Sequence, residues 1–153
     1  QLDDPLGNCR NTPAEAFELS QDFFRVLCFE LIPDSGGPGK YRGGLGARRC
    51  YEILEDNIRF SWASDRFQHR PEGLFGGQPG TCASIEIHRN DDTIQLPSKG
   101  DTVLMKGDIV EVRIGGGGGY GPVEERLQSL VRSDLLNGRI TAESARSVYG
   151  IEI

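Results

Sequence analysis

An unbroken run of five glycines, Gly115 to Gly119 within RIGGGGGYG, limits the possible folds of this 153-residue chain more than any other feature. Each ordered glycine costs roughly 0.5–1 kcal/mol relative to alanine in backbone entropy, so an ordered run must be stabilised by contacts. Only glycine lets backbones approach one another closely, as in packed polyproline-II segments. We therefore predict an ordered, packed run, in which Gly117→Ala destabilises by about 1 kcal/mol or more if the backbone approach there is close or φ is positive. The alternatives are a flexible linker and, less favoured, a nucleotide cradle, because no Gly-Lys-Ser/Thr follows the glycines.

The middle of the chain has the composition of short β-strands. Segments rich in β-branched and aromatic residues alternate with clusters of Gly, Pro, Asn and Asp, and they cover residues 23–32, 47–55, 57–64, 81–89 and 101–114. This spacing predicts a meander of antiparallel strands.

Helical signals lie at both ends of the chain. Thr12, Pro13 and Glu15 form a capping-box pattern at the start of a short helix over residues 11–19. Apolar residues recur at helical spacing over 122–138 and stop at Asn137-Gly138, and Thr141 begins a second helix that stops at Gly150.

These elements predict an α+β fold with two C-terminal helices. The length suits a single domain over 1–153. Its expected parts are a β-rich region over 1–114, the glycine-rich segment 115–121 and a helical tail over 122–153.

Composition excludes several classes of function. The net charge is −6 and the basic residues are scattered, so nucleic acid is not an expected partner. No apolar run approaches the roughly 18 residues of a membrane span, so no membrane is expected either. The four cysteines lack Cys-x-x-Cys or nearby His spacing, which disfavours zinc. A buried free thiol is favoured over a disulfide at Cys28, and this predicts a cytoplasmic protein.

Ser35 lies in Asp-Ser-Gly-Gly-Pro, the pentapeptide around the nucleophilic serine of trypsin-like proteases. A catalytic serine needs a base, and in that arrangement the base precedes the serine in the chain. Both histidines, His69 and His88, follow Ser35. We predict a turn at this stretch and no nucleophile.

Two loops carry candidate ligand or interface residues. Asp34 and Arg42 flank a glycine-rich loop whose backbone N–H groups could face an anion, with Arg42 as a bidentate fork. Asp65 and Arg66 pair a carboxylate with a cation, and His69 is close by in sequence. Structural roles, such as a turn cap for Asp34 and an ion pair for Arg42, are the more common alternatives. The catalytic residues remain unknown, and no metal site is expected.

Five motifs together resemble the carboxy-terminal part of the hydantoinase B family, which includes the B-like half of 5-oxoprolinase and subunits of acetone and acetophenone carboxylases. The motifs are NTPAEAFE, PDSGGPGKYRGGLGARR, SDRFQHRPEGLFGGQPG, GGGGGYG and NGRITAESARSVYG, in this order. The resemblance spans nearly the whole chain. Family members usually continue the glycine run with Gly-Asp-Pro, whereas this chain reads GPVEERL, so no role of that Asp carries over.

The resemblance implies a function that composition alone does not show. In this family a hydantoinase A-like subunit binds ATP and Mg²⁺ and phosphorylates an amide or enolate oxygen, and the activated species is then hydrolysed or carboxylated. This chain is expected to bind no cofactor and to act as a C-terminal domain or small subunit, together with that partner and the rest of the B subunit. Hydrolysis of a cyclic amide is the leading expectation. A ketone carboxylase or a non-catalytic assembly subunit is the alternative.

Overall fold

The structure is a computed structural model that describes residues 13–151. Seven strands form two antiparallel sheets; they are β1 (Phe24–Leu31), β2 (Ala47–Ile53), β3 (Ile58–Ala63), β4 (Ser84–Arg89), β5 (Asp92–Gln95), β6 (Lys99–Leu104) and β7 (Ile109–Ile114). The larger sheet has the order β1-β2-β7-β4-β5, and β3 pairs with β6 in the smaller one. The predicted α+β class is confirmed.

The predicted meander is wrong about strand order. The segment 101–114 is interrupted by a turn at Gly107. Its φ of +91° is a backbone conformation that residues other than glycine rarely adopt. β6 and β7 therefore separate into different sheets, and β7 lies between β2 and β4. The strand β5 was not predicted, because all four of its residues are exposed and show no apolar alternation.

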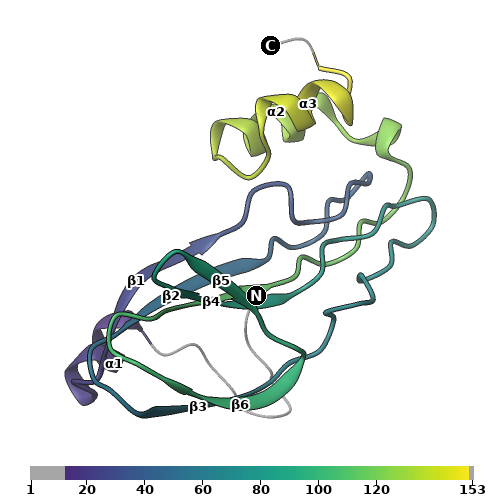
Figure 1. The fold of residues 1–153 in the computed structure, drawn as a ribbon. Coiled ribbons are helices and arrows are strands. Elements are labelled where there is room, and N and C mark those ends of the chain that lie inside the picture. Colours follow the sequence, from purple (N-terminus) through teal and green to yellow (C-terminus); the bar gives the residue numbers. More distant parts are fainter. Residues whose placement is uncertain (1–12, 152–153) are drawn as a thin grey trace.

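The main core lies between the two sheets. Its buried residues are Ile53, Ile85, Ile87, Leu104 and Val110, and aromatic side chains such as Phe60 and Trp62 pack against them. Figure 1 shows the β3–β6 ribbon below the larger sheet, and the extended segments lead from one end of that sheet towards the C-terminal helices.

The helices are short: α1 (Ala14–Ser20), the 3₁₀ turn η1 (Val123–Glu125), α2 (Gln128–Leu136) and α3 (Ala142–Ser147). The helix predicted over 122–138 begins with η1, and its α-helical part is only α2. The predicted cap of α3 is confirmed, since the Ser144 backbone N–H donates to Thr141 Oγ1 at 3.1 Å. In α1 the N-cap is Pro13. Thr12 and the side chain of Glu15 lie outside the described residues.

A small second core joins α2 to α3. Val131, Ile140, Ala145 and Ile151 are buried together there. None of the helices within residues 13–151 is long and apolar enough to cross a membrane.

Candidate functional site: the glycine bundle and its charged neighbours

Three extended stretches, residues 35–46, 71–82 and 115–121, pack together in what we call the glycine bundle. They run side by side between the larger sheet and the C-terminal helices (Figure 1). The Gly37 N–H donates to the Gly117 carbonyl at 2.8 Å, and the Gly117 N–H donates to Gly44 at 2.9 Å. The Gly119 N–H donates to Gln78 at 2.9 Å. The run 115–121 is therefore bonded to both other stretches.

Most glycines of the run have no room for a side chain. A Cβ atom would overlap a backbone carbonyl oxygen of a neighbouring stretch at Gly115, Gly116, Gly118 and Gly119. The predicted close packing is confirmed, and the linker interpretation is wrong. Gly117 is the exception, because the nearest atom to its added Cβ would be 3.5 Å away. Gly117→Ala is therefore not expected to destabilise the chain through close backbone contact. That destabilisation is expected at the neighbouring glycines instead.

Ser35 has a structural role in the bundle. Its side chain is buried, its hydroxyl donates to the Ile32 carbonyl at 2.6 Å, and it accepts from the Gly46 N–H at 2.8 Å. The bond with Gly46 holds the two ends of one stretch together. No base is hydrogen-bonded to the hydroxyl within residues 13–151, in keeping with the prediction that Ser35 is not a nucleophile.

Asp34 and Arg42 both tie the bundle to the helical tail. Asp34 has a positive φ of 59°, and its carboxylate accepts from the Thr141 N–H at 3.0 Å, at the start of α3. Arg42 donates from Nε to Asp134 Oδ2 at 3.0 Å and from Nη1 to the Gly43 carbonyl at 2.6 Å. The guanidinium fork of Arg42 is thus engaged within the chain.

Asp134, which no sequence motif indicated, is the centre of this contact. Its side chain is 4% exposed and receives ion pairs from Arg126 at 2.6 Å and Arg139 at 3.4 Å, in addition to Arg42. Burial raises the pKa of the Asp134 carboxyl, but hydrogen bonds and charge from Arg42 and Arg126 outweigh it and lower the pKa. A charged Asp134 therefore joins α2 to the bundle.

Asp65 and Arg66 lie elsewhere, where the chain leaves β3. With His69 and Leu96 they line an open cavity of about 470 Å³. The Arg66 backbone has a φ of 65°, and its carbonyl accepts from the Ala83 N–H at 2.9 Å. Within the described part of the chain no hydrogen bond or ion pair joins these side chains to Asp34 or Arg42. The two candidate loops do not form one site.

The solvent-facing side of the larger sheet carries a charged cluster that no sequence motif indicated. Glu111 on β7 is 5% exposed; its carboxylate accepts from Arg48 Nη2 at 2.7 Å and from Arg113, and lies 3.9 Å from His88 Nε2. Cys50 Sγ is 3.5 Å from Glu111 Oε2. Burial raises the pKa of Glu111, but hydrogen bonds from Arg48 and Arg113 outweigh burial and bring the pKa to about 2.

This lowered pKa predicts an acid-dependent loss of stability. The ordinary pKa is 4.5 and the folded value is about 2, so the stability that ionised Glu111 contributes is complete above pH 4.5 and lost as pH falls towards 2. Urea unfolding measured between pH 6 and pH 2 should show a smaller decline for Glu111→Gln than for the unchanged chain. Equal slopes for the two proteins would contradict this interpretation.

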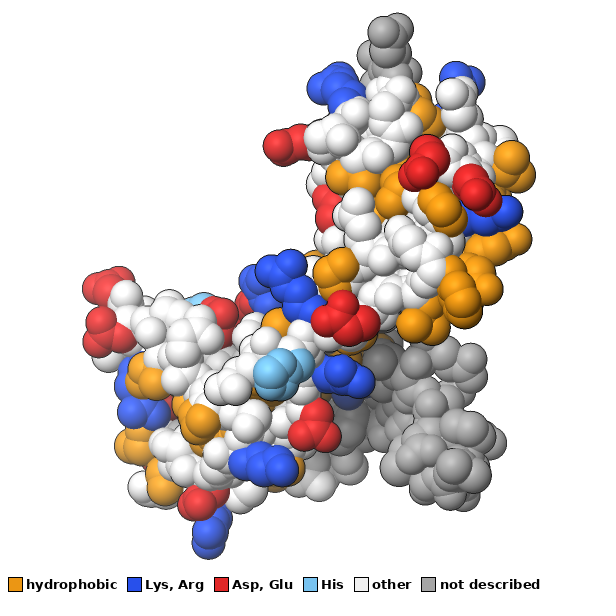
Figure 2. Space-filling view, turned by 90° about the vertical axis from the view of Figure 1, so that its right-hand side faces the viewer, with side chains coloured by type: hydrophobic (Ala, Val, Ile, Leu, Met, Phe, Trp, Pro, Cys, Tyr) orange, Lys and Arg blue, Asp and Glu red, His pale blue; other side chains and the backbone are white. Residues whose placement is uncertain are grey.

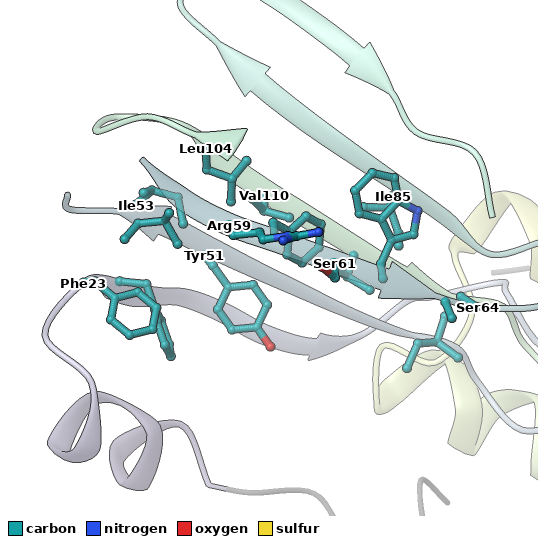
Figure 3. Close-up of a pocket in the computed structure, with 16 residues that line it drawn as sticks. Phe23, Tyr51, Ile53, Arg59, Ser61, Ser64, Ile85, Leu104 and Val110 are labelled. Carbon is teal, nitrogen blue, oxygen red and sulfur yellow. The ribbon is translucent and has the colours of Figure 1, made fainter. Parts of the chain in front are cut away.

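An apolar pocket of about 550 Å³ opens between the two sheets. Figure 3 shows Tyr51, Ile53, Leu104 and Val110 directed into it from strands of both sheets. Its charged lining residue, Arg59, is paired with Asp101 at 3.3 Å. The pocket can accept an apolar group, but its lining includes no carboxylate, histidine or thiol that could act on one. Residues 13–151 also contain no group of three or more His, Cys, Asp or Glu that could hold a metal ion.

Comparison with known proteins identifies the family. Residues 4–123 match the family model described as hydantoinase B/oxoprolinase. The chain is 39% identical, over 94% of its length, to an uncharacterized protein of Methanocaldococcus jannaschii, of which it covers 25%. It is 37% identical, over 99% of its length, to the putative B subunit of a D-/L-hydantoinase from a Pseudomonas strain, of which it covers 26%.

Two solved structures have a similar fold over most of this chain. The ATP-dependent caprolactamase of Pseudomonas jessenii has 26% identity and a TM-score of 0.80, covering 92% of this chain and 25% of that one. Acetone carboxylase, at 19% identity and a TM-score of 0.79 over 95% of this chain and 24% of that one, shares the fold. The chain spans about a quarter of the length of the relatives it matches. On the family match and these identities, the chain belongs to the hydantoinase B/oxoprolinase family.

Proposed function

We propose that this chain works within an ATP-dependent complex that hydrolyses a cyclic amide, as its C-terminal domain or a small subunit. The observation that carries the proposal is the match of residues 4–123 to the hydantoinase B/oxoprolinase model. The names of the relatives support a cyclic amide, since hydantoin, 5-oxoproline and caprolactam all contain one. Carboxylation of a ketone is the alternative, suggested by the shared fold of acetone carboxylase.

The contribution of the chain to such a complex would be a rigid frame. The glycine bundle has little freedom to move because its backbones are in direct contact, and Asp34 and Asp134 fix the helical tail to it. ATP and Mg²⁺ would be bound by a hydantoinase A-like partner. The rest of the B subunit would supply the residues that contact the substrate. The cytoplasm remains the predicted location.

The substrate class can be tested with the assembled complex. The chain, the remainder of the B subunit and the A-like partner would be combined, and ATP hydrolysis measured with hydantoin, 5-oxoproline or caprolactam, and separately with acetone and bicarbonate. Stimulation by a cyclic amide that depends on this chain supports the proposal. Stimulation only by ketone with bicarbonate would replace hydrolysis by carboxylation.

The isolated chain is expected to bind magnesium-ATP no tighter than millimolar and to turn over no substrate. The arginines nearest the glycine loop are already engaged: Arg42 with Asp134, Arg48 with Glu30 and Glu111, and Arg49 over the Phe29 ring at 4.2 Å. The net charge of −6 also disfavours capture of an anion. Calorimetry decides this, and micromolar binding that disappears in a folded Arg42→Ala variant would make this chain the nucleotide site.

An assembly role is the second candidate, and an exposed aromatic group at the end of the bundle favours it. Tyr41, Leu74, Phe75 and Tyr120 are 48–76% exposed, and the Tyr120 ring lies 5.1 Å from Phe75 and 6.2 Å from Tyr41. Figure 2 shows hydrophobic side chains gathered on one side of the upper part of the molecule. Contiguous exposed apolar groups commonly mark protein contacts. If this role is correct, the other subunits without this chain should form a smaller assembly that still shows substrate-stimulated ATP hydrolysis.

A further inference from the structure

Cys28 and Cys50 lie opposite each other on neighbouring strands. They are register partners in the β1–β2 pair, at a β-bulge where β1 advances by two residues and β2 by one. Directly opposed residues of antiparallel strands have Cα atoms about 4.5–5.5 Å apart, and disulfides span about 4.4–6.8 Å between Cα atoms. The backbone therefore already holds the two residues at a separation that a disulfide can bridge.

The two thiols differ in access. Both are free in the structure; Cys28 is partly exposed, whereas Cys50 is only 4% exposed. Burial, followed by the neighbouring Cys28 thiol, raises the pKa of the Cys50 thiol to about 12. Cys28 is the more accessible thiol, and the thiolate, which is the reactive form, is disfavoured at Cys50. An oxidant therefore reacts first with Cys28. This partly exposed position also corrects the expectation that Cys28 is buried.

We propose that Cys28 and Cys50 form a redox-sensitive dithiol that a small-molecule disulfide, such as oxidised glutathione, converts into a cross-strand disulfide. The Cys28 thiolate attacks one sulfur of the small disulfide, whose S–S bond breaks to release one small thiolate. Cys50, once deprotonated, attacks the Cys28 sulfur, and the mixed disulfide breaks to release the second. The protein loses two electrons, and the two thiol protons end on the two released thiols.

Proximity offsets the weak acidity of Cys50. In the second step the mixed disulfide on Cys28 lies next to Cys50, so the reaction is intramolecular and needs only a small thiolate fraction. Arg48, which bridges Glu30 and Glu111, favours ionisation of Cys50 by its positive charge, whereas the Glu111 carboxylate opposes it. The cross-link joins strands that are already paired, so its formation leaves the sheet register unchanged.

The experiment uses the chain with Cys9→Ser and Cys82→Ser, so that only the pair remains. After treatment with oxidised glutathione and alkylation of free thiols, mass spectrometry should show both thiols lost, no retained glutathione and a Cys28–Cys50 peptide in an unreduced digest. The oxidised protein should also melt at a higher temperature than the reduced one.

Further variants test the order of the steps. With Cys50→Ala the reaction should stop at one glutathione adduct on Cys28. With Cys28→Ser the Cys50 thiol should stay unmodified in the folded chain and react only in urea. A stable glutathione adduct in the two-cysteine protein would overturn the proposal. So would two thiols that stay free under conditions that fully modify the same protein in urea.

Discussion

Gly118→Ala is expected to destabilise the chain by about 3 kcal/mol or more, and Gly116→Ala by a similar amount. The added methyl group would overlap the Glu72 carbonyl oxygen in the first case and the Ser35 carbonyl oxygen in the second. Both obstacles are backbone atoms in a bundle tied by hydrogen bonds, so relief requires the stretches to separate. Urea unfolding followed by circular dichroism measures the effect.

Gly117→Ala is the matched control within the same run. The nearest atoms to its added Cβ are those of Gly44, at 3.5 and 3.9 Å, which is ordinary van der Waals contact. Its free energy of unfolding should stay within about 1 kcal/mol of the unchanged chain, because alanine also restricts the unfolded state. If all three variants behave alike, close backbone contact is not what constrains this run.

Asp134→Ala is expected to cost about 3–5 kcal/mol, the usual result of removing one partner from a buried ion pair. The substitution leaves Arg126 and Arg42, whose side chains are 7% and 13% exposed, without the carboxylate that they share. Three arginines would then lie close together without the carboxylate that joins them. Thermal unfolding and protection of the helical tail from proteolysis would both report the loss.

Asp101→Ala serves as the comparison for this prediction. Asp101 pairs with Arg59 at 3.3 Å, but the two side chains are 60% and 76% exposed. An exposed pair contributes about 0–1 kcal/mol, so this variant should be nearly neutral. A loss for Asp134→Ala no larger than for Asp101→Ala would mean that the buried cluster does not hold the helical tail.

Local signals in the sequence predicted local structure well. Thr141 predicted the cap of α3, and Gly150, with a φ of 64°, lies in the conformation that ends helices. The strand segments were found because their composition is local. The packing of the glycine run could also be inferred, because the entropy cost of five glycines requires a compensating contact.

Long-range partners could not be predicted in the same way. Arg42 and Asp134 are 92 residues apart, and nothing near either residue in the sequence specifies the other. Likewise Glu111 on β7 meets Arg48 only because β7 inserts beside β2. From the chemistry of their loop, Asp34 and Arg42 were expected to bind a ligand or a partner protein. In the folded chain their side chains are already bonded to Thr141 and Asp134, which are distant in sequence.

The central positions of β7 and of residues 115–121 have a consequence for synthesis on the ribosome. Chains are made from the N-terminus, yet β2 and β4 both pair with β7, and the outer stretches of the bundle both bond to the glycine run. Until about residue 121 has emerged, the sheet lacks its middle strand and the bundle its centre. From the synthesis of β2 to that of β7 the nascent chain therefore exposes unpaired strand edges, the state in which chaperones are most needed. A stop codon just before β7 would remove the piece that closes both structures at once.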